Sequence, residues 1–164
     1  MRQFLFLLAA LTLPASPSFA QDAARWDVEQ ALGPAKTVAF ETDEATWVNV
    51  TVSPDGRTVL FDVLGDIYSM PIGGTGAGLA TRVKSGAAYH MQPRFSPDGR
   101  WVAYISDAGG GHNVWLMRPN GSDARQLTRE AQRLVNSPAW SPDGQYIYVR
   151  KHFIQQRSLG AGEV

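Results

Sequence analysis

Hydrophobic residues along this chain gather in short runs that alternate with polar segments rich in glycine, proline and aspartate. Three of these runs are rich in β-branched and aromatic side chains, which favour β-strands. They are TVLFDV (58–63), WVAYIS (101–106) and YIYVRK (146–151). Each run follows the tetrapeptide Ser-Pro-Asp-Gly, which begins at Ser53, Ser96 and Ser141. The pattern predicts a repeated unit in which a tight turn leads into a strand.

The Ser-Pro-Asp-Gly tetrapeptide has the chemistry of a turn. Proline presets φ for the first central position, aspartate can bond its own backbone, and glycine accepts the positive φ that ends the turn. A catalytic role for Asp55, Asp98 and Asp143 is the alternative, but turn chemistry accounts for every residue of the motif. We therefore expect the three copies to be structural corners.

The similarity between the repeats extends beyond the turn. The copies are spaced by 43 and 45 residues, a period that suits a four-stranded propeller blade of ~40–45 residues. DIYSMPIGG (66–74) matches NVWLMRPNG (113–121), and ATRVKS (80–85) matches ARQLTR (124–129). Each unit therefore predicts four short antiparallel strands with turns between them.

The apolar residues predict where these strands are covered. Val83 and Leu127 are the candidates for inward-facing side chains in the fourth strand of the first two units. The segment Tyr146–Val149 is apolar at every position, as expected for a sheet that is buried on both faces. Stacked blades produce such burial, and we expect it here.

The pattern Ser-Pro-Asp-Gly, then an apolar strand, then Asp/Asn-Ile-Trp/Tyr-x-Met resembles the WD40-like repeat of TolB-type β-propellers. The resemblance covers residues 48–164. It implies an all-β fold, a partial TolB-like six-bladed β-propeller with about two and a half four-stranded blades, in the periplasm or secreted. The repeats are expected near 48–90, 91–135 and 136–164.

The segment before the first repeat separates two branches of this resemblance. TolB carries a sizeable α/β domain ahead of its propeller, whereas the leader here, residues 21–47, is too short for one. Residues 25–74 and 150–164 are more similar to the N-terminal propeller of large exported amidohydrolase-like proteins. That resemblance implies a metal-dependent hydrolase domain downstream, and none of its catalytic residues can be placed on this sequence.

The third repeat is expected to be incomplete. Glu163 and Val164 align with Asn113 and Val114, at the start of a strand. We therefore expect a fragment of a longer protein. We also expect the chain by itself to be marginally stable, oligomeric or aggregation-prone, because repeat units gain much of their stability from their neighbours.

The N-terminus and the charge balance narrow the setting. Residues 1–20 combine Arg2, an apolar run and small residues ending at Ala20, the layout of a cleaved signal peptide with no membrane span remaining afterwards. Without them the chain carries one more acidic than basic residue, which gives no electrostatic reason to expect nucleic acid. The chain has no cysteine, so we expect its stability to come from packing alone.

Several residues invite a chemical interpretation that their spacing does not support. His90, His112 and His152 lack the close pairing of zinc ligands, and we expect three surface or loop histidines. GGTGAG (73–78) lacks both nucleotide-binding fingerprints, and AGGGHN (108–113) is expected to be the matching loop of the next blade.

The remaining polar candidates are weaker. Ser137 and Ser158 lack the G-x-S-x-G nucleophile elbow. The acidic cluster of Glu41, Asp43 and Glu44 is expected to be a solvated turn. The sequence therefore assigns no catalytic, cofactor-binding or metal-binding residue.

Three functions remain open from the sequence. The first is a non-catalytic propeller of an exported amidohydrolase-like hydrolase, which serves as scaffold, gate or interaction surface for the rest of a longer chain. The second is a stand-alone periplasmic propeller of TolB type that binds envelope proteins. The third is a propeller enzyme acting on sugars or lactones, for which no convergent acidic or metal-binding set is visible.

Overall fold

Three antiparallel sheets make up the computed structural model of the protein, which describes residues 28–30, 33, 34, 36, 38–131, 133–153 and 161–163. The first sheet has the strand order β1 (Val50–Val52), β2 (Thr58–Val63), β3 (Asp66–Pro71) and β4 (Thr81–Lys84). The second has the order β5 (His90–Phe95), β6 (Val102–Ser106), β7 (Asn113–Met117) and β8 (Arg125–Gln126). The third has the order β9 (Val135–Trp140), β10 (Ile147–Phe153) and β11 (Ala161–Glu163). The predicted signal peptide, residues 1–20, lies outside the described residues, as does Ser158.

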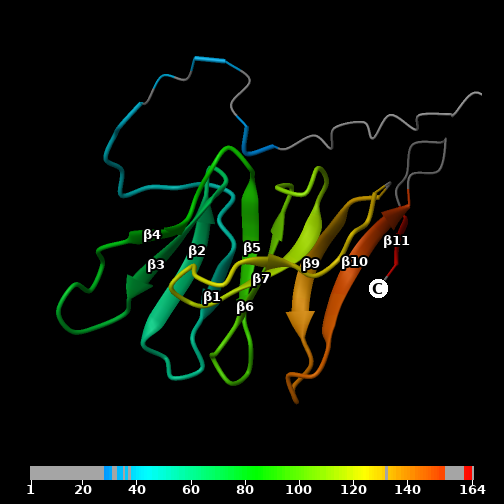
Figure 1. Ribbon diagram of the computed structural model, residues 1–164. Coiled ribbons are helices and arrows are strands. Elements are labelled where there is room, and N and C mark those ends of the chain that lie inside the picture. Colours follow the sequence, from blue (N-terminus) through cyan, green and yellow to red (C-terminus); the bar gives the residue numbers. More distant parts are fainter. Residues whose placement is uncertain are drawn as a thin grey trace, which may run out of the picture.

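The sheets stand side by side as blades 1, 2 and 3, so the fold is all-β and is part of a TolB-like propeller (Figure 1). The β1–β2, β5–β6 and β9–β10 turns lie at the lower end of the blades in Figure 1. The connections β4–β5, β6–β7 and β8–β9 lie at the opposite end, which we call the upper end. The pairing of Lys151 with Glu163 repeats that of Ser106 with Asn113, which confirms the predicted alignment of the third unit.

The Ser-Pro-Asp-Gly turns have the predicted structural role. In the first, the Ser53 hydroxyl donates to Asp55 Oδ1 at 2.6 Å, and the Thr58 N–H donates to Ser53 Oγ at 2.9 Å. The Gly56 N–H closes the turn on the Ser53 carbonyl at 2.8 Å, with φ at 71°. The second and third copies repeat these bonds at 2.5 and 2.9 Å, with glycine φ values of 69° and 70°.

Packing between the blades forms two hydrophobic clusters. Leu60 and Ile67 of blade 1 contact Val102, Tyr104 and Met117 of blade 2, and all five are 0% exposed. A second cluster joins blade 2 to blade 3 and consists of Ile105, Val114 and Val135. Strand β6 is therefore buried along its whole length. Burying each large apolar side chain contributes about 1.5–3 kcal/mol, so the contacts between blades dominate the stability.

Two predictions of burial are wrong. Tyr146 and Tyr148 are 62% and 53% exposed, although Ile147 and Val149 pack inward against the second cluster. The reason is that no described blade covers the other face of β10. Leu127 is also exposed, whereas its counterpart Val83 packs against the first cluster as predicted.

Val83 is covered because the β7–β8 turn of blade 2 lies against it. A Cβ atom on Gly121 would lie 2.9 Å from the Val83 carbonyl carbon and would overlap the carbonyl oxygen. Among the described residues, no equivalent turn of a following blade reaches Leu127. Burial in the outer strand thus depends on the next blade and not on the strand itself.

Hydrogen bonds between the blades also connect their inner parts. Asp62 is 5% exposed and accepts from the Asn49 N–H at 2.7 Å, the Asn49 side chain at 2.9 Å and the Gln92 N–H at 2.6 Å. Gln92 in turn accepts from the Ser137 N–H at 2.6 Å through Oε1. Gln92 and Ser137 have φ values of 55° and 54°, and the β5–β6 register shifts next to Gln92. This left-handed step turns each N–H toward the preceding blade.

Candidate functional site

Glycine-rich loops occur at both ends of the blades, and they are not equivalent. GGTGAG (73–78) belongs to the β3–β4 connection, whereas AGGGHN (108–113) forms the β6–β7 connection and the start of β7. Because β3 and β7 occupy the same place in their sheets, the counterpart of residues 107–112 is the short β2–β3 turn at Leu64 and Gly65. The predicted match between the two loops is therefore wrong. The two loops are both rich in glycine, but they occupy different positions in their blades.

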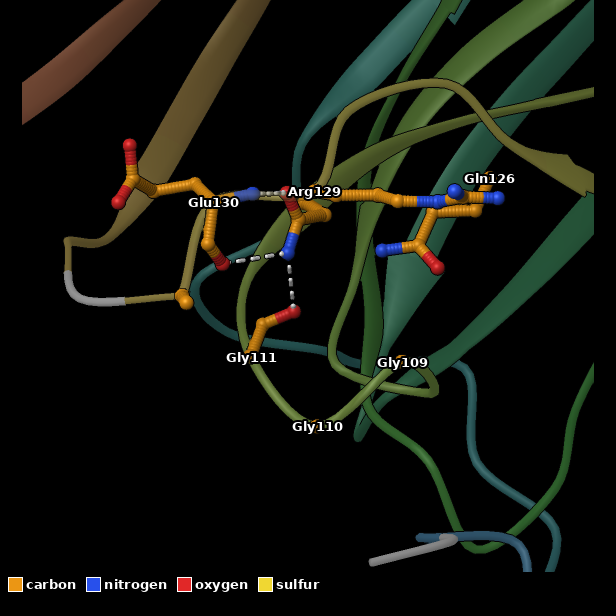
Figure 2. Close-up of a pocket in the computed structure, with 8 residues that line it drawn as sticks. Gly109, Gly110, Gly111, Gln126, Arg129 and Glu130 are labelled. Atoms are coloured by element: carbon orange, nitrogen blue, oxygen red, sulfur yellow. Dashed lines mark hydrogen bonds between the residues drawn. The ribbon is translucent and has the colours of Figure 1, made fainter. Parts of the chain in front are cut away.

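A cavity of about 370 Å³ lies at the upper end of blade 2. Figure 2 shows the glycine loop along one side and the side chains of Gln126 and Arg129 across from it. Its lining is Gly109, Gly110, Gly111, Asn113, Gln126, Arg129, Glu130 and Ala131. Backbone and polar side chains therefore dominate its walls.

Asn113 holds the walls of this cavity together. It is 2% exposed, and its Nδ2 donates to the carbonyls of Gly111 and Glu130, each at 3.1 Å. Its Oδ1 accepts from the Thr128 hydroxyl at 2.8 Å and the Glu130 N–H at 2.7 Å. The amide thus uses both of its donors and both acceptor sites, and it fixes the β8–β9 connection against the glycine loop (Figure 2).

The cavity presents hydrogen-bond donors. Gln126 Nε2 is buried and has no hydrogen-bond partner among the described residues. The guanidinium of Arg129, an exposed residue, extends past the Gln126 amide (Figure 2). Glu130 forms an ion pair with Lys151 of blade 3, and its carboxylate points away from Gln126 in Figure 2. A guanidinium and an unpartnered amide suit a carboxylate or carbonyl oxygen.

Gln126 is the end of a row of buried polar groups on the face of blade 2 that meets blade 1. Four atoms in this row have no hydrogen-bond partner among the described residues: His90 Nε2, Tyr104 Oη, Trp115 Nε1 and Gln126 Nε2. The His90 and Tyr104 ring centroids are 5.8 Å apart, and those of Tyr104 and Trp115 are 6.5 Å apart. Trp115 pairs with Gln126 across the sheet. We call these four residues the donor row.

The position of His90 differs from the one predicted from the sequence. It is 0% exposed, so its predicted place on the surface or in a loop is wrong. Burial lowers the pKa of His90, and Lys84 adds to this shift, while Glu29, Asp66 and Asp107 oppose it. The imidazole is therefore held neutral near pH 7, as burial in an apolar environment demands.

Tyr104 shares this environment. Burial, with a smaller contribution from the negative charge of Glu29, raises the pKa of the Tyr104 hydroxyl. The hydroxyl therefore keeps its proton and is available as a donor. Two signals in the sequence point to this row. His90 is a polar residue at the start of a strand, and Tyr104 is a tyrosine within an apolar strand. Both look like ordinary core positions.

The other residues considered from the sequence do not come together. The pKa values of Asp55, Asp98 and Asp143 are lowered because each accepts hydrogen bonds from its own turn, first from the serine hydroxyl. The turn accounts for these carboxylates. Among the described residues there is no group of three or more metal-ligating side chains.

The histidine, serine and acidic candidates are placed as follows. His112 lies half-buried in the β6–β7 connection, while the side chain of His152 lies outside what the structure describes. The Ser137 hydroxyl donates to Asn136 Oδ1 at 3.3 Å, and among its described contacts no histidine or carboxylate accepts its proton. The residues Glu41, Asp43 and Glu44 form an exposed turn closed by Thr42, as predicted. In the described part of the chain, no helix is long and apolar enough to cross a membrane.

Fold and site together define part of a TolB-like β-propeller whose second blade has a cavity lined by polar groups at its upper end. No family model matches the chain. An uncharacterized protein of Agrobacterium fabrum is 36% identical over 83 residues, which cover 48% of this chain and 27% of that protein. The uncharacterized peptidase YuxL of Bacillus subtilis is 44% identical over 72 residues, 43% of this chain and 10% of the peptidase. Tricorn protease homolog 1 of Streptomyces coelicolor is 31% identical over 94 residues, 57% of this chain and 8% of the protease.

Solved structures show the same fold. A TolB-type protein from Agrobacterium tumefaciens superposes with a TM-score of 0.58 at 28% identity, over 66% of this chain and 39% of that one. TolB from Acinetobacter baumannii superposes with a TM-score of 0.53 at 23% identity, over 69% of this chain and 28% of that one. A puromycin hydrolase superposes with a TM-score of 0.53 at 17% identity, over 67% of this chain and 19% of that one. The chain therefore spans well under half the length of the proteins that it matches.

Proposed function

We propose that this chain is the propeller part of an exported hydrolase, and that the propeller recognises and admits substrate without performing the chemistry. The observation that carries this proposal is the 44% identity with a peptidase over 72 residues of this chain. Tricorn protease homolog 1, 31% identical over 94 residues, supports the same class. The puromycin hydrolase shares the fold. In this proposal the reacting residues belong to another part of the protein.

The geometry of the upper end supports a recognition role. The cavity beside Gln126 and Arg129 presents donors, which suit the carboxylate or carbonyl groups of peptides and amides. A metal-dependent amidohydrolase partner domain is our finer proposal and rests on the resemblance of the leader and the repeats. The peptidase relatives favour a serine- or metal-dependent peptidase as the other form of the same proposal.

A second candidate function has its own support. The 28% identity and TM-score of 0.58 with a TolB-type protein favour a propeller that binds envelope proteins and catalyses nothing. We propose the periplasm, or the outside of the cell, as the location for both candidates because the first twenty residues have the layout of a signal peptide.

The native gene product distinguishes these candidates. An antibody against residues 38–60 would be used to detect the product in envelope and periplasmic fractions and then to purify it. We expect a band far above 17.9 kDa and hydrolysis of chromogenic peptides or amides by the purified product. A product that hydrolyses none of them and co-purifies with a stable envelope partner would replace the hydrolase proposal with the TolB-type function.

A substitution in the cavity tests recognition in that product. Arg129→Ala removes the exposed guanidinium at the upper end, and Arg100→Ala removes an exposed arginine next to the turn at the lower end as a matched control. We expect the first variant to raise KM for substrates with a free carboxylate by about tenfold, the loss of a charge-assisted hydrogen bond, with kcat unchanged. Equal kinetics for both variants would show that the cavity does not contact substrate.

A further inference from the structure

Residues 28–30 of the leader lie at the β4–β5 connection, between blades 1 and 2. There the Glu29 carboxylate accepts a hydrogen bond from the Ala87 N–H at 3.1 Å. The neighbouring Gly86 leaves the space that the carboxylate fills, since a Cβ atom there would lie 2.8 Å from Oε1 and would overlap Oε2. The β4–β5 connection is thus shaped around a carboxylate.

The buried imidazole of His90 faces the same carboxylate. Ser106 Oγ lies 2.9 Å from His90 Nδ1 and accepts from the Ala108 N–H at 3.1 Å. With the Ser106 proton assigned to Nδ1, the neutral ring carries its own proton on Nε2. Glu29 Oε1 lies 4.0 Å from this Nε2, which is beyond hydrogen-bond distance, and Nε2 has no hydrogen-bond partner in the described chain.

A donor without an acceptor is costly in a buried position. An unsatisfied buried N–H or O–H costs about 1–3 kcal/mol, and His90 and Tyr104 each carry one, both with 0% exposure. Glu29 lies near enough for its charge to act on both groups. Its side chain is 38% exposed, so it approaches this site from the solvent side and stops short of the imidazole.

We propose that this place is a carboxylate-binding site, formed by the Ala87 N–H and His90 Nε2 beside the buried Tyr104 ring, and that Glu29 of the leader is a resident ligand which an external carboxylate can displace. A free carboxylate is not held back by the leader, so it can approach Nε2 to the ~2.8 Å of a charge-assisted hydrogen bond. Glu29 then occupies the site until a carboxylate ligand replaces it. This inference does not depend on the proposed hydrolase function.

The test uses acetate as the probe and NMR of the whole chain as the readout. Glu29→Ala vacates the site, Glu29→Gln keeps the shape without the charge, and Glu41→Ala removes an exposed acidic residue of the leader as a control. In Glu29→Ala we expect saturable shifts of the Ala87 amide and the His90 ring signals on addition of acetate. The wild type and Glu41→Ala should need at least about tenfold more acetate, because a tethered carboxylate competes at an effective concentration in the millimolar range.

Two further results decide the inference. Gly86→Ala, combined with Glu29→Ala, should abolish the acetate shifts because its methyl group occupies the carboxylate position. If Glu29→Ala impairs folding, the same titration with Glu29→Gln, whose neutral amide competes weakly, replaces it. Equal acetate titrations in the wild type and the folded Glu29 variant would overturn the proposal, as would His90 and Ala87 signals that neither acetate nor loss of Glu29 changes.

Discussion

The contact between Gly121 and Val83 is the sharpest test of how the blades support one another. Gly121→Ala places a methyl group against the Val83 carbonyl, at 2.9 Å from the carbon and in overlap with the oxygen. The atom in the way is backbone, so no change of rotamer can relieve the overlap. The β7–β8 turn of blade 2 would have to move away from the outer strand of blade 1.

A matched substitution separates this overlap from the strain of the backbone. Gly121 and Gly56 have φ values of 85° and 71°, and a Cβ atom on Gly56 would meet nothing within 4 Å. Both alanine variants therefore pay the left-handed penalty of about 1–2 kcal/mol. Only Gly121→Ala adds the cost of overpacking, about 1–3 kcal/mol, so its free energy of unfolding should fall below that of Gly56→Ala by this amount.

Urea unfolding followed by tryptophan fluorescence measures the difference. We expect both variants to lower the midpoint, with a larger decrease for Gly121→Ala and an m-value close to that of the wild type. Equal midpoints for the two variants would refute the reasoning. They would mean that the β7–β8 turn does not bear on blade 1, and that blades 1 and 2 are held together by the first hydrophobic cluster and the bonds of Asp62.

Four other perturbations follow from the same contacts. Asp62→Ala leaves the part-buried Gln92 N–H without its acceptor and should lower the free energy of unfolding in urea by about 3 kcal/mol. A decrease of less than about 1 kcal/mol would contradict this. Because burial lowers the pKa of His90 from 6.5, the stability that its neutral form supports is complete above pH 6.5 and is lost as the pH falls through the lower folded pKa. His90→Gln should flatten this part of the curve of stability against pH. An unchanged curve would be contrary evidence. The pKa of Asp98 is lowered from 3.8 by Ser96, so the turn should be fully stabilising above pH 3.8 and weaken below it, and Ser96→Ala should reduce that acid sensitivity in thermal melts. The exposed outer faces should make melting of the isolated chain depend on protein concentration, and a sharp transition of a monomer that is independent of concentration would count against this.

Local chemistry let the sequence determine the repeated elements. The turn at Ser53 is satisfied by its own hydroxyl, carboxylate and glycine, and therefore forms wherever the tetrapeptide occurs. The strands β2 and β6 follow from short apolar runs and were predicted within a residue of their bounds. Strands β3 and β7 begin where the matched segments begin and end before the glycine-containing turns of those segments. Their order within each sheet follows because short turns join antiparallel neighbours.

Only the tertiary structure decided which groups are buried and which meet. His90, Tyr104 and Glu29 are separated by many residues in the sequence. The pairing of β5 with β6 brings His90 and Tyr104 together, and the bond of Glu29 to the Ala87 N–H brings the leader to them. The same dependence explains why Leu127 is exposed while its counterpart Val83 is covered. Turns and strands are stabilised by bonds within a few residues, whereas burial and the sites that depend on it are properties of the neighbouring blade.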